Sequence, residues 1–216
     1  MLLHRHSIEQ VIIFTRYPEA GKVKTRLIHK LGAAGAARLQ RHLTEQVINQ
    51  VRPVTRQRPA RLVLHYTGGS RRRMREWLGS ALPLAKQRGR NIGHRMLAAF
   101  QSTWQEGAVR AVLIGSDCPA LDGPLIAGAL ERLLTHDLVL GPSRDGGYYL
   151  IGLHRSLAPD TQESLFSDIN WGTAAVFGQT LDRAAEAGLS SYTLQPLHDI
   201  DRAQDLEHFH HHPHFQ

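Results

Sequence analysis

Three stretches of the chain carry side chains whose types and spacing could do chemistry. The first, residues 15–27, follows a short apolar run and contains four cations: Arg16, Lys22, Lys24 and Arg26. Gly21 allows close approach of the backbone, Lys24 supplies a point charge, and Arg26 supplies a forked donor for phosphate oxygens. Because Val23 stands where a Walker A loop has Ser or Thr, a different kind of phosphate-binding loop is predicted, lying outside the core.

The second stretch, residues 115–121, follows the most strand-like segment of the chain, residues 109–114. A carboxylate at the carboxyl end of a strand can hold Mg²⁺ through one ligand while phosphates and water fill the other positions. Asp117 fits this role. No histidine is near Cys118 in the sequence, and Pro119 suggests a turn, so we expect a packed thiol there and not a nucleophile.

The third stretch, residues 141–149, places Gly146 and Gly147 before an apolar strand, where they can bring the backbone close to a ligand. Asp145, with Arg144, could orient polar groups of that ligand. Farther along, residues 198–206 hold three carboxylates around a strand-to-helix turn: Asp199, Asp201 and Asp205. One of them could complete a metal site.

Strands and helices alternate along the sequence. Apolar runs predict strands at 11–15, 61–66, 82–87, 109–114, 138–140, 147–153 and 191–197, and periodicity predicts helices at 33–51, in the basic segment around 71–78, and at 92–105, 122–135, 173–187 and 203–209. Pro53 is expected to end the first helix, Asp122 and Thr173 to cap later ones, and Gly188 to close the helix after Thr173.

This alternation predicts a three-layer α/β sandwich with a mostly parallel sheet and helices on both faces. Ligands bind beyond the carboxyl ends of the strands in such sheets, so the loops after Thr15, Ile114 and Leu140 are expected to share one crevice. We expect a single domain at 10–207, a flexible N-terminus at 1–9 and a frayed, His-rich tail at 208–216.

Composition narrows the class of protein. With 42% apolar and 21% charged residues, the chain is globular in type, and its apolar runs fall short of the roughly 20 residues of a membrane span. The formal charge of +7 favours an anionic partner. Polar residues interrupt any N-terminal signal peptide, and the lone Cys118 excludes an internal disulfide, so a cytoplasmic location is predicted.

The combination of motifs resembles a known bacterial family over about residues 10–207. The matching residues are Pro18, Gly21 and 24–27, then 115–121, Gly141-Pro142, 145–149, 171–173, 199–201 and 205–206. The family comprises small glycosyltransferases of the glycosyltransferase-A (nucleotide-diphospho-sugar transferase) fold, which are related to 2-phospho-L-lactate guanylyltransferase. Residues 90–95 depart from the family pattern because two acidic positions are lost, and the turn at 201–205 lacks the usual Thr-Pro-Glu.

The resemblance implies roles for individual residues. Asp117 and Asp201 would bind Mg²⁺ or Mn²⁺, and Lys24 and Asp117 would be catalytic. The nucleotide would be bound by Arg16, Gly21, Lys24, Thr25, Arg26 and Ser116, and the substrate by Asp145, Gly146, Gly147 and Trp171.

Glycosyl transfer from a nucleotide-diphospho-sugar to a small acceptor is the function that these observations favour. An alternative is nucleotidyl transfer, in which a nucleoside triphosphate is joined to a phosphorylated acceptor, because the same cations could serve both reactions. A third hypothesis, from another class, is a non-catalytic basic module that binds nucleic acid. The sequence does not identify the base, the sugar, the acceptor or the oligomeric state.

Overall fold

The computed structural model describes residues 8–210, with side chains described through residue 207. A seven-stranded sheet in the order β3-β2-β1-β4-β6-β5-β7 forms its centre. The strands are β1 (Glu9–Arg16), β2 (Ala60–Thr67), β3 (Leu84–Lys86), β4 (Arg110–Gly115), β5 (Leu138–Pro142), β6 (Tyr148–His154) and β7 (Ser191–Thr193). Only β6 runs antiparallel to its neighbours. The predicted mostly parallel sheet is therefore confirmed.

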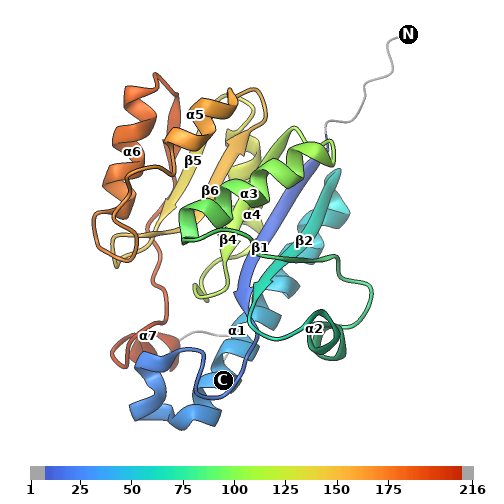
Figure 1. Cartoon of the computed structure of the whole chain (residues 1–216), viewed down its shortest axis with the longest axis vertical. Coiled ribbons are helices and arrows are strands. Elements are labelled where there is room, and N and C mark those ends of the chain that lie inside the picture. Colours follow the sequence, from blue (N-terminus) through green and yellow to red (C-terminus); the bar gives the residue numbers. More distant parts are fainter. Residues whose placement is uncertain (1–7, 211–216) are drawn as a thin grey trace.

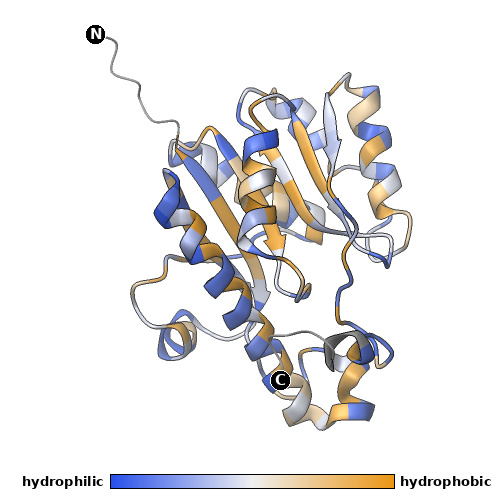
Figure 2. Cartoon of the chain, turned by 180° about the vertical axis from the view of Figure 1, so that it is seen from behind, coloured by the Kyte–Doolittle hydropathy of each residue, from blue (hydrophilic) through white to orange (hydrophobic). Residues whose placement is uncertain are grey.

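Helices cover both faces of the sheet, as predicted. They are α1 (Ile28–Gln57), α2 (Arg71–Leu78), α3 (Ile92–Gln105), α4 (Gly123–Arg132), α5 (Pro159–Ser164), α6 (Val176–Glu186) and α7 (Asp205–His210), with a short 3₁₀ helix η1 (Thr25–Leu27). Helix α3 lies in front of the sheet in Figure 1, whereas α1 lies behind it and comes to the front in Figure 2. Within residues 8–210, no helix is long and apolar enough to span a membrane.

The alternation of side chains along β1 builds two cores. Val11 and Ile13 pack with α1 and α4 on one face, and Ile12 and Phe14 pack with α3 on the other. The apolar strands between these helices are visible in Figure 2.

A third, smaller apolar cluster joins distant parts of the chain. Leu27, Leu39 and Leu43, from η1 and α1, pack with Ile200 and Leu206, from the turn before α7 and from α7 itself. Figure 1 shows α7 beside the first turns of α1, at the end of the molecule where β1 finishes. This cluster therefore holds residues 199–206 against the loop that follows β1.

The expected bounds of the first helix and of the helix after Thr173 were wrong. Helix α1 contains a kink at Gly32 (φ 70°) and continues through Pro53 to Gln57, because Val54 packs into the core at 4% exposure. Helix α6 begins at Val176, while the Thr173 hydroxyl accepts a hydrogen bond from the Ala175 amide in the preceding turn. Helix α5 was not predicted at all.

Several local predictions are confirmed. Helix α3 has the predicted bounds, the Asp122 carboxylate caps α4 by accepting from the Leu125 amide, and Gly188 follows α6 with φ 68°. The last predicted strand is shorter, since β7 ends at Thr193.

A buried carboxylate lies at the amino-terminal ends of the parallel strands, at the opposite end of the sheet from the three loops. Glu9 is 1% exposed and lies in β1, so the folded region begins before residue 10. Its oxygens accept from the Arg58 guanidinium at 2.8 and 3.0 Å and from Arg110 at 3.2 and 3.3 Å. The predictions of a flexible N-terminus and a frayed tail otherwise fall on residues 1–7 and 211–216, outside the described residues.

Candidate active site at the carboxyl edge of the sheet

The three loops singled out in the sequence meet at one edge, because parallel strands in register end together. Phe14 of β1 pairs with His65 of β2 and with Gly115 of β4. Two adjacent cavities open there, of about 360 and 940 Å³. Both are lined by Phe14, Ile92, Gly115 and Asp201, so they share a wall. Loop one (residues 15–27) lines mainly the smaller cavity, and the loop between β5 and β6 lines the larger one.

Lys24 lies deeper than a loop residue was expected to lie. Its backbone is left-handed (φ 46°), which turns the side chain inward just before η1. The ammonium, 3% exposed, contacts Asp117 Oδ1 at 2.9 Å and donates to the Ile200 carbonyl at 2.5 Å. The expectation that Lys24 lies outside the core is therefore wrong: it joins loop one, the loop after β4 and the segment before α7.

Asp117 is tied to the same segment through its backbone as well. Its carbonyl accepts from the Ile200 amide at 2.9 Å, while its carboxylate stays 45% exposed. The backbone of Asp117 is thus fixed by a neighbour 83 residues away, and its side chain faces the smaller cavity.

Asp201 also carries a counter-ion from loop one. The Arg26 guanidinium donates to Asp201 Oδ2, in a pair whose side chains are 62% and 38% exposed. Asp205 supports this turn by accepting from the Asp201 and Arg202 amides at 3.0 and 2.6 Å. Asp117 and Asp201 therefore line one cavity, and each is neutralised by a cation of the same loop.

This donor set fits a divalent cation held jointly with a nucleotide. Within residues 8–210, no group of three or more His, Cys, Asp or Glu side chains is placed to hold a metal alone. Mg²⁺ commonly takes one or two carboxylates together with substrate phosphates and water. Two aspartates on the wall of one cavity are compatible with that arrangement; their shared ligation of one ion stays a prediction.

A buried polar network that the sequence analysis missed supports the site. Gln40 Nε2 lies within hydrogen-bond distance of the hydroxyls of Thr15, Thr44 and Ser116, at 3.2 to 3.3 Å. Ser116 in turn approaches Asp117 Oδ1 at 3.4 Å. The signal was present in the sequence, because Gln40 interrupts the apolar stripe of α1, and a polar side chain on a buried face requires partners.

Not all of the predicted nucleotide-binding residues lie in the cavities. Arg16 and Ser116 line the smaller cavity, and Arg26 lines the larger one. Neither cavity is lined by Gly21 (φ 80°), which allows the turn in loop one, or by Thr25, which begins η1.

The loop between β5 and β6 forms one side of the larger cavity. Asp145 Oδ1 accepts from the Ser143 hydroxyl and from the Gly147 amide, the latter at 2.9 Å. Gly146 (φ 90°) does not line the cavity, because it packs on the segment before α6: a Cβ there would lie 2.3 Å from the Ala174 carbonyl oxygen. Gly146 therefore shapes the loop, whereas Asp145 and Gly147 line the cavity.

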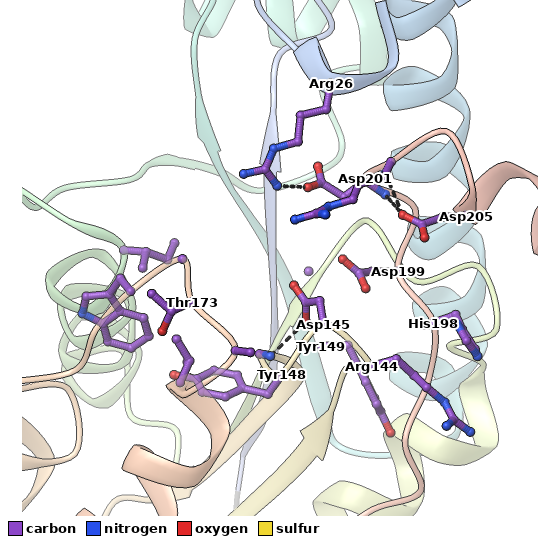
Figure 3. Close-up of a pocket in the computed structure, with 18 of the residues that line it drawn as sticks. Arg26, Arg144, Asp145, Tyr148, Tyr149, Thr173, His198, Asp199, Asp201 and Asp205 are labelled. Carbon is purple, nitrogen blue, oxygen red and sulfur yellow. Dashed lines mark hydrogen bonds and ion pairs between the residues drawn. The ribbon is translucent and has the colours of Figure 1, made fainter. Parts of the chain in front are cut away.

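Among the described carboxyl groups, Asp199 has the pKa that its surroundings raise most. Burial raises its pKa to about 6, and the charges of Asp145 and Asp117 act in the same direction. Figure 3 shows the carboxylates of Asp145 and Asp199 facing one another. The sequence placed Asp199 near the site but did not pair it with Asp145, because only the fold brings the β5–β6 loop beside the segment before α7.

Aromatic side chains also line the larger cavity. Trp171 lies on the first turn of α3, where a Cβ on Gly93 would be 2.5 Å from Cζ2 of the indole. Tyr148 meets the indole edge-on, with ring centroids 6.5 Å apart and an interplanar angle of 82°. Trp171 therefore lines the cavity as a fixed, partly exposed aromatic surface.

Comparison with known proteins places this architecture among the nucleotide-diphospho-sugar transferase folds. A structure from Desulfovibrio desulfuricans G20, provisionally named a nucleotide-diphospho-sugar transferase, has 35% identity and a TM-score of 0.85 over 94% of this chain and 86% of that one. More distant similarity in fold extends to the glucosyl-3-phosphoglycerate synthase of Mycobacterium tuberculosis, solved with Mg²⁺ and UDP (13% identity, TM-score 0.57, 94% of this chain and 74% of that one). It extends also to the inositol-1-phosphate CTP transferase of T. maritima (12% identity, TM-score 0.56, 92% and 91%).

The sequence also matches a family profile over residues 50–173, more than half of its length. That family is described as "Uncharacterized protein conserved in bacteria (DUF2064)". The chain belongs to this family, and its resemblance to the transferase from Desulfovibrio desulfuricans identifies it as a transferase. The search of curated proteins finds no match.

Proposed function

We propose that the protein is a metal-dependent glycosyltransferase that uses a nucleotide-diphospho-sugar. The observation that carries this proposal is the pairing of Lys24 with Asp117 and of Arg26 with Asp201, two carboxylates that line one cavity. Two carboxylates and two cations in one place match the needs of a metal–diphosphate ligand, in which phosphate oxygens bind both the metal and the cations.

The smaller cavity suits the diphosphate and the larger one suits the sugar and the acceptor. Bound between Asp117 and Asp201, Mg²⁺ or Mn²⁺ would act as a Lewis acid toward the phosphate oxygens. As the acceptor's hydroxyl oxygen bonds to the anomeric carbon and loses its proton to water, the bond between that carbon and the diphosphate breaks and negative charge develops on the leaving group. Arg26 and Arg16 would stabilise that charge by charge-assisted hydrogen bonds, while buried Lys24 keeps Asp117 in place.

The two loop-one cations differ in burial, which supports different parts for them in this scheme. Arg26 is exposed, and a surface ion pair contributes only about 0–1 kcal/mol, so its bond to Asp201 exchanges readily for a bond to phosphate. Lys24 is buried and held by two oxygens from different segments, so it stays in place. Asp117 remains exposed enough to offer its second oxygen to a metal.

Nucleotidyl transfer is the second candidate, and the similarity in fold to the inositol-1-phosphate CTP transferase supports it. The same cations would then bind a nucleoside triphosphate. The acidic floor of the larger cavity, formed by Asp145 and Asp199, is a poor surface for a phosphorylated acceptor, so glycosyl transfer is favoured. The products distinguish the two reactions, because glycosyl transfer releases a nucleoside diphosphate and nucleotidyl transfer releases pyrophosphate.

A thermal-shift panel tests the proposal directly. Nucleoside diphosphates, nucleoside triphosphates and nucleotide sugars would each be added with Mg²⁺, with Mn²⁺ and with chelator. A ligand at 100 times its Kd stabilises a protein by about 2.7 kcal/mol, which gives a clear shift. We expect a nucleotide sugar to stabilise the protein only with metal; equal stabilisation in chelator would contradict the metal-dependent site.

Substitutions of the aspartates test their separate roles. Asp117→Ala and Asp201→Ala should abolish metal-dependent nucleotide binding, whereas Asp199→Ala should reduce it less. Asp145→Asn should lower turnover more than it lowers nucleotide affinity, because Asp145 lines only the larger cavity. Equal losses in rate and in nucleotide affinity would move Asp145 to the diphosphate side.

A further inference from the structure

The larger cavity combines an aromatic wall with a floor of one charge. Trp171 packs against the bare backbone at Gly93 and meets the ring of Tyr148 at a steep angle, and both contacts limit the motion of its ring. A pyranose ring presents C–H groups on one face, and a preformed aromatic surface packs against such a face at small entropic cost. The wall therefore fits a sugar ring.

The negative charge of the cavity floor limits which substituents the sugar ring can carry. In the described part of the chain, both hydrogen bonds to Asp145 reach Oδ1, which leaves Oδ2 to accept from a ligand. Asp199 faces it across the cavity (Figure 3). Two carboxylates accept hydrogen bonds from hydroxyl groups, whereas they would repel a carboxylate or phosphate on the ligand.

The arginines along this cavity do not reverse that charge. Arg26 is paired with Asp201, and Arg202 is exposed on the turn before α7. Figure 3 shows the Arg144 side chain running toward His198, away from Asp145 and Asp199. The cation that acts on Asp199 is Lys24, which is buried and already bound to Asp117 and to the Ile200 carbonyl.

We propose that the larger cavity takes an uncharged pyranose, stacked on Trp171 with its hydroxyl groups bound by Asp145 and Asp199, and that it excludes sugars bearing a carboxylate or a phosphate. This inference rests on the proposed function, which places the transferred sugar here. It adds the class of sugar, and with it the prediction that uronic-acid donors are not used.

A pair of simple glycosides tests the proposal without knowledge of the nucleotide. Methyl α-D-glucopyranoside and methyl α-D-glucopyranosiduronate differ only at C6, where the second carries a carboxylate. Saturation-transfer NMR on the full chain should show binding of the glucoside and at least fivefold weaker binding of the glucuronide. Equal or stronger binding of the glucuronide would overturn the proposal.

Variants locate the binding and separate a local effect from misfolding. Trp171→Ala should weaken glucoside binding at least fivefold, and Trp171→Phe should retain most of it. Trp77→Ala serves as the matched control, because Trp77 packs on Tyr17 outside this cavity and should leave the signal unchanged. Asp145→Asn should narrow the difference between the two glycosides. Unchanged glucoside binding in Trp171→Ala would also overturn the proposal.

The two proposals fail in different ways. If metal-dependent nucleotide binding is found but UDP-glucose and UDP-glucuronate bind equally to the same preparation, only the selection of an uncharged sugar is wrong. If the glucoside binds at Trp171 but no nucleotide stabilises the protein, the sugar site stands and the nucleotide-dependent function is wrong.

Discussion

Arg26 and Asp201 form an ion pair across a sequence separation of 175 residues, at the wall shared by the two cavities. Loop one and the turn before α7 thus meet through opposite charges beside these cavities. An ion pair in that position competes with a metal for the carboxylate and with a phosphate for the guanidinium. Under the proposed function, a metal–nucleotide complex would displace Arg26 from Asp201 and then accept hydrogen bonds from it.

Arg26→Gln should change metal affinity and nucleotide affinity in opposite directions. Without nucleotide, Mn²⁺ should bind up to about fivefold more tightly, since an exposed pair is worth up to about 1 kcal/mol. Nucleoside diphosphate should bind about tenfold or more weakly, because a charge-assisted hydrogen bond of about 1.5–3 kcal/mol is lost. Calorimetry measures both affinities, with Arg72→Gln as the control, since Arg72 pairs with Glu76 on α2. Weakening of both affinities would mean that Arg26 only supports the fold.

Lys24→Met should lower stability by about 2 kcal/mol. Breaking a buried ion pair costs about 3–5 kcal/mol, and the exposure of Asp117 lets water recover part of that. Urea unfolding of Lys24→Met beside Arg26→Gln makes the comparison, because the exposed arginine should contribute less than about 1 kcal/mol. If the two variants were equally stable, Lys24 would not be what stabilises the contact between loop one and Ile200.

His65 should make the protein less stable in acid. Burial lowers its pKa from the usual 6.5 to about 4, so the unfolded chain binds the proton more strongly than the folded chain does. The stability that the neutral ring confers is complete above about pH 6.5 and is lost as the pH falls toward 4, by about 3 kcal/mol at most.

His65→Phe supplies the measurement for that prediction, because it keeps the ring that stacks on Phe14 and removes the proton. Denaturation of both proteins at several pH values should show the variant gaining on the natural protein between pH 6.5 and 4. A difference that does not vary with pH would refute the assignment to His65.

Glu9→Gln should destabilise the fold by about 3 kcal/mol, since it leaves two partly buried guanidinium groups without their carboxylate. Nucleotide affinity, measured well below the melting temperature, should not change. Glu9 lies at the amino-terminal end of β1, and the cavities open at the other end of the strands. A loss of nucleotide affinity without a loss of stability would contradict this separation.

The sequence alone predicts those parts of the fold that depend on short-range pattern. Helix α3 repeats apolar residues every four positions, and Asp122 stands two residues before Pro124, so both features were located correctly. Pro53 does not end the helix, although its sequence position predicted that it would. The proline lacks the amide that would bond to the carbonyl of Asn49, but Asn49 is exposed, so water can solvate that carbonyl. Val51 and Val54 are buried and hold this part of the helix on the sheet.

The candidate site follows the same division. The carboxyl ends of parallel strands gather loops, so the meeting of loop one with the Asp117 and Asp145 loops could be predicted. The burial of Lys24 could not, because it depends on a left-handed backbone at residue 24 and on a carbonyl 176 residues away. The opposition of Asp145 and Asp199 depends in the same way on packing between distant segments.

The apolar cluster of Leu27, Leu39 and Leu43 with Ile200 and Leu206 also sets a time at which the site can first exist. Lys24 emerges early during translation, but its carbonyl partner follows 176 residues later. At about 5–20 residues per second, that interval is roughly 10 to 35 seconds. During it the loop carries its cations without the segment that orients them, so a nascent chain cannot capture nucleotide until nearly the whole domain has been synthesised.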